Sequence, residues 1–210
     1  MKIIKPNADC RHGPQAREEL LWLMAQPTAA EAPPCPGCRL HAQLVCSSRC
    51  EQAPQQLSID AINYPIETHV VPLVYEMAVM RVVQPCWSCE GHLSPTGELW
   101  KIPQVSFYAK SPIYAQLLLR HVSSLELQKQ LTYLWHVALS DFGQSWDVVY
   151  TLEPNLNYDQ SRHAQLHLLQ RDLNTLAENL SSKIKSLAQT MLNESPEATM
   201  SSSRQIETTS

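Results

Sequence analysis

The sequence YLWHVALS-DFGQ-SWDVVYTL, residues 133–152, decides the fold class, because two alternating runs flank a short turn that contains Gly143. Alternation of apolar and polar residues is typical of half-buried strands and predicts a β-hairpin. With the turn at 141–144, the large apolar side chains fall on one face that packs against helices, with the pairs Leu139 and Trp146, Val137 and Val148, and Trp135 and Tyr150. The other face carries His136, Asp147 and Thr151, which either meet solvent or line a shallow site.

A second hairpin is predicted on the amino-terminal side of the first. The turn sequence SPTG at 94–97 separates a run over 87–93 from one over 98–108, in which Val105 and Phe107 alternate with polar neighbours. Helices are expected from residue 15, after Pro72, and from Pro112, because proline suits the first turn of a helix. The sequence therefore predicts an α+β fold in which antiparallel β-hairpins are packed by short helices.

The carboxy-terminal part predicts one long amphipathic helix over residues 156–192. Apolar side chains recur there every three or four positions, at Leu166, Leu169, Leu173, Leu176, Leu180, Ile184, Leu187 and Met191. This apolar seam has to be covered by the rest of the domain, by a second copy of the chain, or by a different protein. A homo-oligomer or a partner protein is therefore expected at the helix 160–192, with packing in the chain's own core as the alternative.

Composition divides the chain into four segments. Residues 1–33 are expected to form a helical arm and a Pro-rich linker, since four prolines stand within 27–36. Residues 34–155 are expected to form a Cys-rich α+β core domain with zinc-binding loops, followed by the long helix at 156–192. Residues 193–210 are rich in Ser, Thr and Glu and are predicted to be a disordered tail.

Charge and glycine content exclude several classes of function. The formal net charge of −4 lacks the basic surplus of a general nucleic-acid binder, and the five glycines form no Gly-rich phosphate loop. No apolar run reaches the roughly 20 residues that span a membrane, and the amino terminus does not resemble a secretory signal. A cytoplasmic protein without a membrane partner is expected, and closely spaced cysteines in that reducing compartment favour metal binding.

Four of the seven cysteines lie in one short segment, at Cys35, Cys38, Cys46 and Cys50. The two-residue gap around Gly37 allows two sulfur atoms in a tight turn to reach one ion, and the three-residue gap of the second pair spans one helical turn. Zinc suits such a site, because tetrahedral sulfur ligation satisfies it. His41 lies between the two pairs and is an alternative ligand.

The pair Cys86 and Cys89 lies in the sequence PCWSCEGH, residues 85–92, and allows three interpretations. The two thiols complete a metal site, with His92 or together with Cys35 and Cys38. Alternatively, they form a redox dithiol in which one thiol has a lowered pKa, or they are buried structural thiols.

The sequence thus favours an intracellular zinc-binding protein in which the metal orders the core loops and the carboxy-terminal helix mediates association. The candidate ligands are Cys35, Cys38, Cys46, Cys50, Cys86, Cys89 and His92. The main alternative is an enzyme, either a zinc-dependent hydrolase in which Glu90 or Glu76 moves the proton, or a thiol oxidoreductase using Cys86 and Cys89. A zinc-dependent nucleic-acid binder is a further alternative. It is supported only by Arg39, next to Cys38, and Arg49, next to Cys50.

Overall fold

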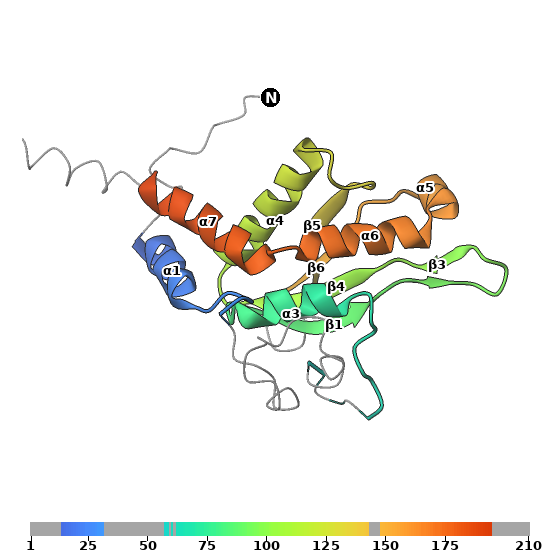
Figure 1. Ribbon diagram of the computed structural model, residues 1–210, viewed down its shortest axis with the longest axis horizontal. Helices are drawn as coiled ribbons and strands as arrows, with labels where there is room; N and C mark the ends of the chain where they lie inside the picture. The colour runs from blue at the N-terminus through green and yellow to red at the C-terminus, as the bar shows by residue number, and fades with distance from the viewer. Residues whose placement is uncertain (1–13, 32–56, 59, 61, 143–147, 195–210) are drawn as a thin grey trace, which may run out of the picture.

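The computed structural model describes residues 14–31, 57–58, 60, 62–142 and 148–194. A four-stranded antiparallel sheet has the strand order β1-β4-β6-β5, with bounds Val83–Cys89, Gln104–Ala109, Val148–Pro154 and Trp135–Phe142. Two short strands, β2 (His92–Leu93) and β3 (Leu99–Lys101), pair with each other beyond the ends of β1 and β4 (Figure 1). The predicted mixed α+β class with antiparallel pairing is confirmed.

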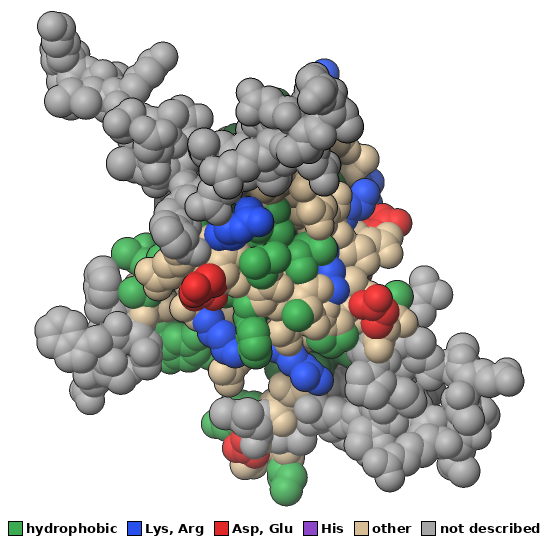
Figure 2. Space-filling view, turned by 90° about the vertical axis from the view of Figure 1, so that its left-hand side faces the viewer, with side chains coloured by type: hydrophobic (Ala, Val, Ile, Leu, Met, Phe, Trp, Pro, Cys, Tyr) green, Lys and Arg blue, Asp and Glu red, His purple; other side chains and the backbone are tan. Residues whose placement is uncertain are grey.

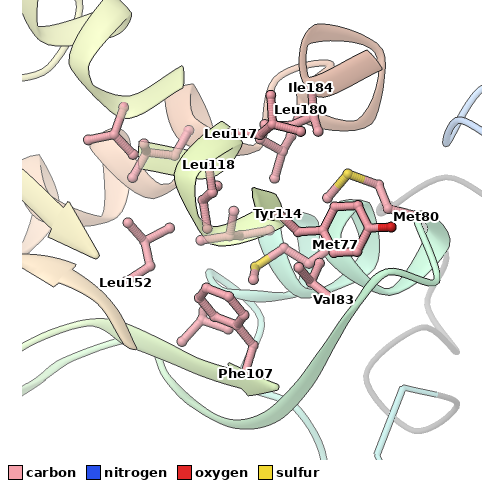
Figure 3. Close-up of a cluster of buried hydrophobic side chains, with 14 of the residues drawn as sticks. Met77, Met80, Val83, Phe107, Tyr114, Leu117, Leu118, Leu152, Leu180 and Ile184 are labelled. Atoms are coloured by element: carbon pink, nitrogen blue, oxygen red, sulfur yellow. The ribbon is translucent and has the colours of Figure 1, made fainter. Parts of the chain in front are cut away.

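The helices of the described residues are α1 (Pro14–Ala25), α3 (Val71–Val79), α4 (Pro112–Leu127), α5 (Tyr158–His163), α6 (Leu166–Ala177) and α7 (Leu180–Asn193). Among them α3 packs on β1, and α4 packs on β4 and β5. Phe107 and Leu152 project from the sheet toward Met77 and Leu118 in the core between sheet and helices (Figure 3). The opposite face of the sheet is more polar and carries a hydroxyl group network in which Thr151 bonds to Ser106, 2.8 Å away, and to Ser140.

The hairpin of β5 and β6 forms as predicted, but its register differs. Leu139 pairs with Tyr150 instead of Trp146, a shift of four residues along β6, and the register is irregular between Leu139 and Asp141. Because side chains alternate between the two faces of a sheet, a shift by an even number of residues leaves the large apolar side chains on the face predicted for them. Trp135 and Leu152 on that face are buried against the helices. Trp146, the expected partner of Leu139, and Asp147, expected on the polar face, lie outside the described residues.

The predicted single helix over 156–192 is broken, which corrects the sequence interpretation. Asn179 adopts a left-handed conformation with φ of 56° between α6 and α7, and asparagine tolerates this conformation better than most residues. The apolar seam continues across the bend and is buried in the chain's own core at Leu169, Leu173, Leu176, Leu180, Ile184 and Met191. Packing within the chain, one of the expected coverings, therefore accounts for the seam.

Helix α1 belongs to the same core, although the sequence interpretation assigned residues 1–33 to an arm outside the core domain. Leu20 and Leu23 are fully buried, and α1 packs against α7. The hydroxyl group of Tyr114 on α4 donates to the Glu19 carboxylate at 2.5 Å and to the Glu19 carbonyl at 2.9 Å. The core thus joins the two ends of the described chain.

Buried His121 on α4 makes stability depend on pH. Its ring Nε2 lies 3.4 Å from the carbonyl oxygen of Leu176 on α6. Burial lowers the pKa of His121 and the charge of Lys183 lowers it further, against the opposing effect of the Leu176 carbonyl. Since the folded pKa lies below the unfolded value of about 6.5, the unfolded chain takes up the proton first as the pH falls. The contribution of neutral His121 is present above about pH 6.5 and is lost as the pH falls toward the folded pKa.

We expect the free energy of unfolding of the wild type to fall more steeply below pH 6.5 than that of His121→Gln. The difference in slope should approach about 1.4 kcal/mol per pH unit, the value for one proton. Glutamine keeps a donor for Leu176 but does not titrate in this range. Urea titrations at several pH values measure both curves, and parallel curves would contradict the assignment.

Candidate metal centre

Three side chains from two segments of the chain converge at one end of β1. Glu67 precedes α3, Cys89 is the last residue of β1, and His92 is the first residue of β2. One ligand atom from each lies within 4.8 Å of the other two, and this is the group suited to a metal ion among the described residues. The turn between Cys89 and His92 is made by Gly91, whose φ of 85° favours glycine.

The Glu67 carboxylate contacts two residues of the segment that follows Cys89, one through each of its oxygen atoms. Its Oε1 lies 2.9 Å from Nε2 of His92, and its Oε2 accepts a hydrogen bond of 2.7 Å from the backbone N–H of Glu90. The backbone donor fixes one carboxylate oxygen and leaves the other free to bind a metal ion. Carboxylates that ligate metals are commonly held by hydrogen bonds in this way.

The Glu90 carboxylate completes a reciprocal arrangement. Its Oε2 accepts a hydrogen bond of 2.8 Å from the backbone N–H of His69, so each of two carboxylates caps the backbone of the other segment. The Glu90 carbonyl accepts from the side chain of Gln170 on α6 at 3.2 Å. Segment 67–69, the turn after β1 and helix α6 are therefore tied together at this point.

The three candidate ligands differ in their exposure to solvent. Cys89 is buried, with 2% of its surface exposed, whereas the side chains of His92 and Glu67 are 38% and 35% exposed. Burial raises the pKa of the Cys89 thiol and the Glu67 carboxylate adds to this, while the Gly91 N–H and Lys101 oppose it. A bound cation reverses that balance, because a coordinating thiol is deprotonated.

An exposed aromatic side chain stands beside His92. The ring of Trp100 on β3 lies 6.5 Å from the ring of His92, and Trp100 is 73% exposed. The Lys101 ammonium lies 4.8 Å from the centroid of the Trp87 ring. The site is thus a shallow one, with its sulfur atom inside and its imidazole and carboxylate at the surface.

The structure brings together only part of the predicted ligand set. Cys89 and His92 are in the group, whereas Cys86 is exposed and does not belong to it. Cys86 lies where the register of β1 against β4 shifts, between Pro85 and Trp87. Cys35, Cys38, Cys46 and Cys50 lie outside the described residues.

The geometry gives no support to an activated dithiol. Cys86 and Cys89 are both free thiols, one exposed and one buried. Although Cys86 is partly exposed, its thiol loses some of its hydration to neighbouring residues, and this raises its pKa. Burial raises the pKa of the Cys89 thiol as well. A redox nucleophile needs the opposite shift.

The acids expected to move a proton are otherwise engaged. Glu76 on α3 accepts a hydrogen bond of 2.9 Å from the backbone N–H of Ser181, at the start of α7. Glu90 is next to the group, but its carboxylate caps His69. The carboxylate that does reach Cys89 and His92 is Glu67, which the sequence analysis did not single out. Its position just before a Pro-containing helix is too common a pattern to mark it.

Comparisons with family models, curated proteins and solved structures found no match for this chain. Within the described residues, no helix combines the length and the apolarity needed to cross a membrane.

Proposed function

We propose that this chain is a metal-binding protein whose ion is held by Glu67, Cys89 and His92. The observation that carries the proposal is the convergence of a carboxylate oxygen, a sulfur and an imidazole nitrogen within 4.8 Å. Four-coordinate ligation at bonds of 2.0–2.3 Å needs ligand atoms about 3.5 Å apart, so small side-chain rotations suffice.

Zinc is the metal that fits this donor set best. Zinc accepts sulfur, nitrogen and oxygen ligands in one tetrahedral site, whereas magnesium and calcium prefer oxygen alone. The buried thiol of Cys89 supplies the soft donor, and the backbone N–H of Gly91, 3.4 Å from that sulfur, stabilises its thiolate form.

The ion would cross-link two segments of the chain that are far apart in the sequence. Glu67 stands just before α3, and Cys89 and His92 flank the turn between β1 and β2. An ion shared by them fixes the approach of these segments, so metal binding contributes to folding free energy. Association through the carboxy-terminal helices is not part of this proposal, because their apolar seam is buried in the chain.

A zinc hydrolase is the second candidate function. Three protein ligands leave one coordination position for water, which is the arrangement of catalytic zinc. The partial exposure of His92 and Glu67 gives that position access to solvent.

Cobalt titration of the full chain tests the proposal. Co²⁺ replaces zinc in such sites, and its thiolate charge-transfer absorption reports a cysteine ligand. Changing Cys89→Ser or His92→Gln is expected to weaken cobalt affinity by about 100-fold or more. Changing a residue that only supports a ligand through a hydrogen bond has a smaller effect, about 10- to 100-fold. Glu90→Gln, which alters the supporting carboxylate, should fall within that smaller range.

Cys86→Ser is the matched control, because Cys86 lies on the same strand but outside the group. It should retain wild-type affinity. A second background, in which Cys10, Cys35, Cys38, Cys46 and Cys50 are all serine, leaves Cys86 and Cys89 as the only cysteines of the chain. Equal effects of Cys86→Ser and Cys89→Ser in that background, or an absence of cobalt binding by it, would overturn the proposal.

A further inference from the structure

A cavity of about 840 Å³ lies at the opposite end of β1 from the candidate metal centre, between the carboxyl end of α3, the start of β1 and the end of β4. Much of its lining is apolar and includes Leu57, Val74, Val83 and Pro85. Its volume falls in the range of small-molecule sites. Figure 2 views the side of the molecule where β1 begins, and Lys and Arg side chains lie there among apolar ones.

The charges in this cavity have one sign. Arg81 and Lys110 line it, and no acidic side chain does within the described part of the chain. Among the described residues, neither Arg81 nor Lys110 forms an ion pair with a carboxylate. The Lys110 ammonium lies 5.7 Å from the centroid of the exposed Trp22 ring, a cation–π contact with a neutral partner, so Lys110 keeps its full positive charge.

Backbone pairing brings the two cations to the same cavity. The N–H of Lys110 donates to the carbonyl of Val82 at 3.1 Å, and Val83 pairs with Ala109 in the sheet. Arg81 has a φ of 58°, a left-handed conformation that is unfavourable for arginine. This conformation ends α3: the N–H of Arg81 donates to the carbonyl of Ala78 at 3.2 Å, and the chain turns from the helix into β1.

We propose that this cavity binds a small amphipathic carboxylate. The apolar part of the ligand would pack on the accessible side chains of Leu57, Pro85 and Tyr108. Its carboxylate would lie between Arg81 and Lys110. Arginine suits this role, because its planar fork of donors matches a carboxylate. The proposal is independent of the metal centre.

Isothermal titration calorimetry of the full chain with decanoate tests this assignment, below the concentration at which decanoate forms micelles. Decanol, with the same tail and no charge, is the comparison ligand. Decanoate is expected to bind at least about 10-fold more tightly than decanol, the ratio for one hydrogen bond to a charged group. Equal binding of the two ligands, or no binding of decanoate, would overturn the proposal.

Arg81→Asn removes the cation and keeps a residue that tolerates positive φ, so the variant should fold. Its affinity for decanoate should fall at least about 10-fold. Lys129→Asn is the matched control, because Lys129 also has a positive φ, of 55°, is exposed and does not line the cavity. The same affinity in both variants would contradict the assigned role of Arg81.

Discussion

Replacing Asp172 with alanine should destabilise the fold by about 3 kcal/mol or more, because one buried carboxylate serves three donors. Asp172 is fully buried on α6. It accepts from the backbone N–H groups of Thr132 and Tyr133, each at 2.9 Å, and from the Trp135 indole at 3.3 Å. These donors precede and begin β5, so Asp172 fixes the start of that strand against α6. Alanine leaves all three without this acceptor.

Urea or guanidinium titration measures the effect, with Asn174→Ala as the control on the same helix. Asn174 is exposed, and its substitution should change the free energy of unfolding by less than about 0.5 kcal/mol. Asp172→Asn should fall between the two, because its carbonyl accepts but its amide group meets the donors. A loss for Asp172→Ala no larger than that for Asn174→Ala would contradict the role assigned to this carboxylate.

Gly91→Ala is expected to cost about 3 kcal/mol, from two separate causes. The φ of 85° disfavours any side chain, by about 1–2 kcal/mol. A Cβ at this position would also lie 2.6 Å from Cδ1 of Leu166, which can rotate away, and 3.0 Å and 3.1 Å from Cδ and the backbone N of Pro103, which cannot. Overpacking of this kind adds about 1–3 kcal/mol.

Gly97→Ala separates the two causes. Gly97 has nearly the same φ, 83°, but a Cβ there would meet no atom within 4 Å. It should show the backbone cost alone, so the difference between the two variants measures the contact with Leu166 and Pro103. Because Gly91 joins Cys89 to His92, Gly91→Ala should also weaken metal affinity, whereas Gly97→Ala should not. Equal losses of stability in the two variants would contradict the packing argument.

In the hairpin of β5 and β6, the local sequence pattern predicted the strands and the buried face but not the register. Alternation over 133–152 predicted two strands and the face that Trp135 turns to the core. The register was predicted wrongly, because the turn was placed at 141–144, whereas Asp141 and Phe142 belong to β5 and pair with Val149 and Val148. The irregularity between Leu139 and Asp141 changes the register by only one residue. The long helix was wrong for a similar reason: the apolar period continues through Asn179, whereas the backbone does not.

The candidate centre was predictable only where its residues are close in sequence. Cys89 and His92 stand three positions apart, so they were recognised as a pair of ligands. Glu67 reaches them through tertiary packing across more than twenty residues, and a single carboxylate carries no spacing signal. Cys86, chosen for its spacing from Cys89, lies where β1 is irregular and is not brought to the group.

An anomalous difference map from crystals of the full chain grown with zinc tests the central claim most directly. Data collected at the zinc absorption edge should contain a peak bounded by Glu67, Cys89 and His92. The Cys89 sulfur should lie about 2.3 Å from the ion, and an imidazole nitrogen of His92 about 2.0–2.1 Å from it. A map in which zinc is bound elsewhere, with the Glu67 carboxylate still on the His92 ring and no peak between them, would contradict the account.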